Sequence, residues 1–149
     1  MGADIHVKIV RFNPPKKKWE SVKLFTHIKD TWNEIPVYDA RNYELFDVLT
    51  ETDFPRTSIN IDTLPLDLAA EIEKDQHEIG TYNFLEVNLA DAIIYLHSHP
   101  TILNDKEEEK RNPLKSFLDI IYNYIDFFDP LWNCSAIYSQ IRIIYWFDR

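Results

Sequence analysis

Hydrophobic and polar residues alternate through the first ten residues of the chain. The apolar positions are Ala3, Ile5, Val7 and Ile9, and the polar positions between them are Asp4, His6 and Lys8. Because successive side chains of a strand point to opposite faces, this period of two predicts a β-strand with one face in a core. The other face presents a carboxylate and an imidazole side by side. We therefore expect any chemistry to lie near the polar face.

A second strand is predicted over residues 19–26, where polar and apolar positions alternate again. The connection, residues 13–18, holds two prolines and three lysines, which is typical of a solvent-exposed turn. The two strands together are interpreted as a β-hairpin. Residues 27–38 show no regular pattern and are expected to be irregular, with Asp39 available to cap the helix that follows.

Several stretches carry the spacing of amphipathic helices. A short apolar stripe marks residues 41–49, and another begins near Asp67. Asn88 is the expected N-cap of a helix that ends near residues 97–100. The longest stripe starts after Asn112 and repeats every three or four residues as far as residue 128. This stripe is interpreted as a face of the core rather than an oligomer interface.

Residues 140–148 are rich in β-branched and aromatic residues on both faces of a strand, which is typical of a central strand. The sequence shows no internal repeat and no domain boundary, so residues 1–149 are predicted to form a single domain. We predict an α+β fold: an antiparallel sheet that includes the N- and C-terminal strands and the β-hairpin, with helices packed on one face. The first and last strands are expected to be neighbours in this sheet.

Charge and composition exclude several classes of function. The chain has 149 residues, is 45% hydrophobic and carries a net charge of −9. Such a surface repels phosphate backbones, which argues against nucleic-acid binding; it suits a basic partner or simply favours solubility. With Gly2 and Gly80 as its two glycines, the chain has no glycine-rich phosphate loop. The single Cys134 excludes an internal disulfide and a multi-cysteine zinc site.

The N-terminus leads directly into an alternating strand, and the sequence shows no signal peptide and no apolar run of membrane-spanning length. We therefore expect a cytoplasmic protein with no membrane contact. The sequence leaves its oligomeric state open.

Three short motifs resemble those of a family of small uncharacterised proteins from phages and prophages. The opening Met-Gly-Ala-Asp-Ile-His is similar to that family's Met-Gly-Cys-Asp-Ile-His, with Ala3 in place of its cysteine. Residues 41–46, Arg-Asn-Tyr-Glu-Leu-Phe, resemble its Arg-Asn-Tyr-Asp-Leu-Phe. Residues 142–148, Arg-Ile-Ile-Tyr-Trp-Phe-Asp, resemble its closing Arg-Ile-Val-Phe-Trp-Phe-Asp. The motifs keep the family's order across the whole chain, and the resemblance implies a phage or prophage origin.

Asp4 and His6 are the first candidate site. Residues two apart on a strand point the same way, so they could ligate one divalent metal ion, or Asp4 could orient His6 as a general base. Two ligands do not complete a metal site, and the rest would have to come from elsewhere. The alternative, which we favour, is that both side chains hydrogen-bond to neighbouring loops and order the chain ends.

Two further groups of residues are candidates. Arg41, Asn42 and Tyr43 are expected at a helix start, where Arg41 could clamp a carboxylate or phosphate of a ligand. A structural pairing of Arg41 with Asp4 or Asp148 is favoured over that, and it predicts Asp4, His6 and Arg41 in one cluster. The imidazoles of His97 and His99 follow a helix and are interpreted as contacts of its C-terminal end, with a metal or catalytic site as the alternative.

Two hypotheses of function follow. The first is a non-enzymatic phage or prophage accessory protein that acts through contacts with an unidentified protein partner. It rests on the resemblance, the acidic charge, the absence of cofactor motifs and the 14% aromatic content. The second is a small metal-dependent enzyme, or a ligand-binding protein, that uses Asp4 and His6.

Overall fold

The computed structural model describes residues 4–79, 84–99, 102–103, 109–110, 112–128 and 135–148. Ala3, Gly80 and Cys134 lie outside these ranges. The strands are β1 (Asp4–Asn13), β2 (Lys18–Val22), β3 (Leu24–Ile28), β4 (Thr31–Ile35), β5 (Tyr38–Arg41), β6 (Thr57–Ser58), β7 (Leu85–Asn88), β8 (Ile102–Leu103), β9 (Glu109–Lys110) and β10 (Ile141–Asp148).

The helices are α1 (Tyr43–Leu49), α2 (Leu66–Ile79), α3 (Leu89–Ser98) and α4 (Pro113–Phe128), with 3-10 turns at η1 (Ile61–Thr63) and η2 (Ser135–Gln140). Two of the predicted helix starts are confirmed. The Asn88 side chain caps α3 by accepting a hydrogen bond from the Ala90 backbone N–H, and Pro113 is the first residue of α4. The expected cap at Asp39 was wrong, because Asn42 caps α1 through the Leu45 N–H.

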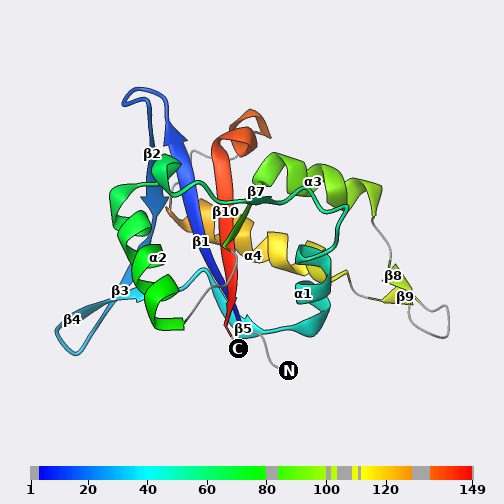
Figure 1. Cartoon of the computed structure of the whole chain (residues 1–149), viewed down its shortest axis with the longest axis horizontal. Helices are drawn as coiled ribbons and strands as arrows, with labels where there is room; N and C mark the ends of the chain where they lie inside the picture. The colour runs from blue at the N-terminus through cyan, green and yellow to red at the C-terminus, as the bar shows by residue number, and fades with distance from the viewer. Residues whose placement is uncertain are drawn as a thin grey trace.

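The two ends of the described chain pair with each other at the centre of the main sheet. Strand β1 runs antiparallel to β10, from Asp4 opposite Asp148 to Arg11 opposite Ile141. The strand order is β2–β1–β10–β7–β6, and β5 also pairs with β1 (Figure 1). The predicted adjacency of the first and last strands and the central position of the last strand are therefore confirmed.

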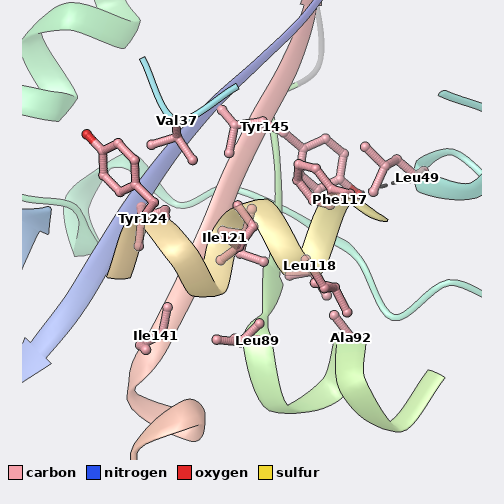
Figure 2. Close-up of a cluster of buried hydrophobic side chains, with 14 of the residues drawn as sticks. Val37, Leu49, Leu89, Ala92, Phe117, Leu118, Ile121, Tyr124, Ile141 and Tyr145 are labelled. Atoms are coloured by element: carbon pink, nitrogen blue, oxygen red, sulfur yellow. Dashed lines mark hydrogen bonds between the residues drawn. The ribbon is translucent and has the colours of Figure 1, made fainter. Parts of the chain in front are cut away.

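One face of the sheet is covered by α1, α3 and α4. Apolar side chains of β1 and β10 pack there against α4, which crosses the sheet (Figure 2). From α4, this layer includes Leu114, Phe117, Leu118, Ile121 and Ile125. The apolar stripe of α4 thus faces the core of its own chain, as its spacing predicted.

The opposite face of the sheet carries α2. Leu68 and Ile72 of α2 pack with Val10, Ile144 and Trp146 in a second, smaller apolar cluster. The α+β fold with a helical layer on one face is confirmed, and α2 adds a helix on the other. Among the residues that the structure describes, no helix is long and apolar enough to cross a membrane.

The segment between β2 and β5 departs from the sequence prediction. The strand predicted over residues 19–26 is divided at Lys23: β2 forms the predicted hairpin with β1, and β3 forms a separate hairpin with β4. The expectation of irregular structure over residues 27–38 was wrong for the end of β3, for β4 and for the start of β5. Figure 1 shows the β3–β4 hairpin extending away from the rest of the protein.

The turn of the β3–β4 hairpin explains why the sequence concealed it. The turn residues Lys29 and Asp30 both have positive φ, at 51° and 63°. A two-residue hairpin turn with positive φ at both positions is usually made by Asn-Gly or Asp-Gly, because other residues are strained there. Lys-Asp carries no such signal, so the alternation on either side of it was not recognised as two strands.

Two adjacent isoleucines of α4 test the assignment of the core. Ile121 is 0% exposed, whereas Ile120 is 40% exposed. We expect Ile121→Ala to lower the free energy of unfolding by about 2–5 kcal/mol, because it removes buried methyl groups and leaves a cavity. The same change at Ile120 should cost less than about 1 kcal/mol. Urea denaturation of both variants measures the difference, and equal losses would contradict the placement of α4.

Candidate interaction site at the β3–β4 hairpin

The polar face of β1 lies on the same side of the sheet as α2. Ile5, Val7 and Ile9 belong to the apolar layer under α4, while Val10 belongs to the α2 cluster. The alternation of a strand then places Asp4, His6 and Lys8 on the α2 side. All three are only partly exposed, and each has a charged partner on another element.

Asp4 pairs with Arg41, as predicted. The Arg41 Nε donates to the Asp4 Oδ1 at 3.2 Å, across the antiparallel pairing of β1 with β5. Arg41 ends β5, whereas the helix begins at Tyr43, so the expectation that Arg41 opens the helix was wrong. Both charged side chains are about half exposed, and such a pair contributes less than about 1 kcal/mol to stability.

Asn42 and Tyr43 have separate roles in this region. The Asn42 side chain caps α1 and donates to the Tyr38 hydroxyl at 3.2 Å. It lines a cavity of about 310 Å³ together with Tyr38 and residues of α1 and α4. Tyr43 is exposed and does not line that cavity. These contacts explain the motif Arg-Asn-Tyr as a strand end, a cap and a helix start.

His6 pairs with Asp39. The His6 Nδ1 lies 3.2 Å from the Asp39 Oδ1, and the imidazole stacks on the Trp146 indole with ring centroids 5.6 Å apart. These residues line a cavity of about 220 Å³ that also includes Lys8 and Glu71. The structure therefore supplies an Asp-oriented histidine, but the carboxylate is Asp39 and not Asp4.

Among the described residues, the metal hypothesis for Asp4 and His6 gains no further ligands. Asp4 is directed to Arg41 and His6 to Asp39. Within the described parts of the chain, no group of three or more His, Cys, Asp or Glu side chains could hold a metal ion.

Lys8 lies at the point where the β3–β4 hairpin leaves the sheet. Residues 4–7 of β1 pair with β5 and residues 9–13 pair with β2, so Lys8 lies between the two partners. Its ammonium binds the Glu34 carboxylate at the base of β4 and lies 3.2 Å from the Glu71 Oε1 on α2. Partial burial lowers the pKa of Lys8, but the two carboxylates outweigh it and raise that pKa overall.

A second ion pair joins the same region to α2. The Lys23 Nζ lies 2.9 Å from the Asp67 Oδ2, and the Ser21 hydroxyl donates to the Asp67 Oδ1 at 3.1 Å. Partial burial raises the pKa of Asp67, but the hydrogen bond and charge of Lys23 lower it overall. Lys23 also lies 3.8 Å from Glu34. Lys23, which separates β2 from β3, thus links the start of the hairpin to α2.

Tyr124 of α4 holds the hairpin base from the opposite face. Its hydroxyl accepts a hydrogen bond from the Leu24 N–H at 3.0 Å and donates to the Ile35 carbonyl at 2.9 Å. Leu24 and Ile35 face each other across β3 and β4, and both pack against the main core. One side chain therefore joins both strands at the point where they leave the molecule.

Beyond this base the hairpin exposes apolar side chains. Trp32 is 68% exposed, and Phe25 and Ile28 are each more than half exposed. The His27 imidazole packs on the Trp32 indole with ring centroids 4.7 Å apart. Large apolar groups on a firmly held projection are typical of an interaction site rather than of a solvated loop. Sequence reasoning missed this site because it assigned residues 27–38, which include His27, Ile28 and Trp32, to irregular structure.

Arg142 is a buried charge that the sequence analysis also missed. Its guanidinium pairs with Glu86, donates to the Thr63 hydroxyl at 3.0 Å and lies 4.9 Å from the centre of a Trp19 ring. These partners come from β7, η1 and β2, so the interaction fastens three segments to the start of β10. We assign Arg142 a structural role.

The histidines near the end of α3 lie as predicted at its C-terminal end. His97 is in its last turn, and His99 follows as the C-cap. The His99 Nε2 lies 3.4 Å from the Asp53 Oδ2, and the ring stacks on Tyr95 with centroids 4.0 Å apart. Burial and the hydrogen bond to Asp53 raise the pKa of Tyr95 to about 12. This cluster links α3 to the segment after α1.

No known protein family, curated protein or solved structure matches this chain. The resemblance to the phage and prophage family therefore stays a prediction from its three motifs.

Removing the Tyr124 hydroxyl tests how the hairpin is held. We expect Tyr124→Phe to lower the free energy of unfolding by about 1–3 kcal/mol, because it leaves the Leu24 N–H and the Ile35 carbonyl without their partner. Amide hydrogen exchange at Leu24 should accelerate more than exchange in β10. Tyr43→Phe is the matched control, since Tyr43 is exposed. Equal effects of the two changes would show that Tyr124 does not hold the hairpin.

Proposed function

We propose that this chain is a cytoplasmic accessory protein of phage or prophage type that acts through contacts with another protein. The β3–β4 hairpin is its contact surface. The observation that carries the proposal is the exposed Trp32 on a hairpin whose base is fixed by Tyr124 on one face and by Lys8 and Lys23 on the other. Its three sequence motifs support the phage or prophage origin.

The energetics of protein interfaces favour such a surface. Tryptophan is among the residues that contribute most to binding when it enters a pocket of the partner. A surface that is already held in place loses little conformational entropy on binding, so more of the contact energy appears as affinity. A hairpin joined to both layers of the protein meets that condition better than a free loop would.

The charge of the chain narrows the class of partner. With 25 acidic and 16 basic residues, the chain repels the phosphate backbone of a nucleic acid. For this reason the proposal does not include nucleic-acid binding. It also involves no membrane contact and no cofactor, as expected from the sequence.

Site-specific cross-linking tests the proposal. A photoreactive phenylalanine analogue at position 32 should give one dominant cross-linked protein in cells that express the chain. The same analogue at position 94 is the control, because Ile94 is similarly exposed but lies on α3. Excess wild-type protein should compete for the adduct, and excess Trp32→Ala should not. Equal adducts at both positions, or competition by both proteins, would contradict a contact surface on the hairpin.

The second candidate function is a ligand-binding protein or small enzyme that uses His6. The cavity of about 220 Å³ beside the His6–Asp39 pair favours it, because an Asp-oriented imidazole is a common general base. Asp4 does not line this cavity, so the function would no longer rest on both residues of the original pair.

Calorimetric titration with Zn²⁺ and Mg²⁺ tests the metal-dependent form of this second candidate. It predicts saturable heat that is lost in His6→Ala and kept in His97→Ala. Heat that persists in His6→Ala would place the metal elsewhere, and the absence of saturable heat would count against a metal site at His6.

A further inference from the structure

We propose that the β3–β4 hairpin, taken as the contact surface of the proposed function, binds a basic protein surface. Arginine or lysine side chains of the partner are then placed against Phe25 and Trp32. The carboxylates beside the hairpin base supply the complementary charge.

In the ion pairs where the hairpin joins the protein, the lysine is the more buried partner and the carboxylate the more exposed one. The Lys8 side chain is 17% exposed, whereas its partner Glu71 is 36% exposed. Lys23 is 26% exposed and its partner Asp67 is 51% exposed. The same order holds where Lys8 meets Glu34. Each pair therefore presents its carboxylate to solvent more than its ammonium group.

Carboxylates also outnumber lysines in these ion pairs. Two lysines, Lys8 and Lys23, share three carboxylates: Glu34, Glu71 and Asp67. Asp39 adds a fourth carboxylate beside the cavity, and it is more exposed than the His6 imidazole with which it pairs. A partner that approaches this region meets an excess of accessible negative charge, which attracts cationic groups and speeds their association.

The aromatic side chains of the hairpin lie on the same face as this charge. Phe25 is opposite Glu34 in the β3–β4 pairing, and His27 is opposite Trp32. Residues opposite each other in an antiparallel pair share a face, and positions two apart share it too. Phe25, Trp32 and Glu34 are thus on one face of the hairpin. A guanidinium over an exposed indole or phenyl ring gains cation–π attraction, and indole is the best acceptor.

A second copy of this chain, or an acidic partner protein, fits the hairpin surface less well than a basic partner does. A second copy of the chain would bring another molecule of net charge −9 against the same acidic region. Like charges brought together at an interface cost binding energy. An acidic partner meets the same objection.

Titration with a defined cationic peptide tests the inference. Deca-arginine should be added to the ¹⁵N-labelled full chain at low salt, with deca-glutamate and a Gly-Ser decamer as control peptides. We expect saturable amide shifts over residues 24–35 and at Asp39 and Glu71 with deca-arginine alone. Because cation–π contacts and exposed ion pairs are each worth roughly 1 kcal/mol, Trp32→Ala and Asp39→Asn should each weaken binding about fivefold.

Two variants and a control assign the effect. Trp32→Ala removes the aromatic contact, and Asp39→Asn removes a carboxylate. Ile94→Ala is the control, because it removes an exposed apolar side chain of α3 and should leave the affinity unchanged. Asp39→Asn should also reduce the dependence of affinity on salt, whereas Trp32→Ala should not. The spectra themselves show whether each variant is folded.

Several outcomes would overturn the inference. Shifts spread over the whole acidic surface would show adventitious charge binding, and the absence of shifts over residues 24–35 would show that the hairpin does not select cations. A cross-link from position 32 to an acidic protein would refute the basic partner and still support the contact surface. A concentration-dependent dimer joined through position 32 would identify a second copy instead. Failure of cross-linking at position 32 would contradict the proposed function itself.

Discussion

The structure depends first on the pairing of its two ends. Strand β1 begins at residue 4, and β10 ends at residue 148, yet the two lie side by side at the centre of the sheet. Their side chains build both apolar layers, with Ile5 and Tyr145 on the α4 side and Val10 and Ile144 on the α2 side. Because these contacts join distant parts of the chain, neither layer is complete before the ends meet.

The central pair also fixes how the remaining segments attach. The Tyr145 hydroxyl on β10 donates to the Leu49 carbonyl at 3.0 Å and thereby holds the end of α1. Arg142 does the same on the other face for β7, η1 and β2. Burial raises the pKa of Tyr145, so its buried hydroxyl stays protonated and remains a hydrogen-bond donor. Strand β10 thus holds segments on both faces of the sheet, through Tyr145 on the α4 side and Arg142 on the α2 side.

Beyond its first residue pair, the β3–β4 hairpin extends outside the core that this arrangement builds. Its segment leaves the edge of β1 at Lys23 and returns at β5, so the sheet edge is interrupted opposite Lys8. At this interruption, ion pairs of Lys8 and Lys23 reach α2 on one face of the sheet. On the other face, the Tyr124 hydroxyl bonds to the hairpin strands β3 and β4. The ion pairs that hold the foot of the hairpin also leave their carboxylates more exposed than their lysines. The same residues therefore stabilise the hairpin and supply the charge for the proposed recognition.

The sequence by itself determined the features that depend on contacts between residues close together in the chain. The alternation in β1 defined its two faces, and Asn88 and Pro113 marked two helix starts, because capping and strand periodicity act within a few residues. The apolar run of β10 likewise required a central strand, since both of its faces had to be covered. The pairing of Arg41 with Asp4 was predicted, with Asp148 as the alternative partner, but the expected helix start at Arg41 was wrong, because Arg41 ends β5.

Tertiary structure alone decided which groups meet across the sheet. Asp39 rather than Asp4 became the partner of His6, because β5 returns antiparallel to β1 and places Asp39 opposite it. The β3–β4 hairpin bonds at its base to Tyr124, which lies 100 residues from Leu24 and 89 from Ile35 in the sequence, and it turns without a glycine. Arg142 found partners on three separate segments. No local pattern encodes such contacts, because their energy exists only once distant segments have been brought together.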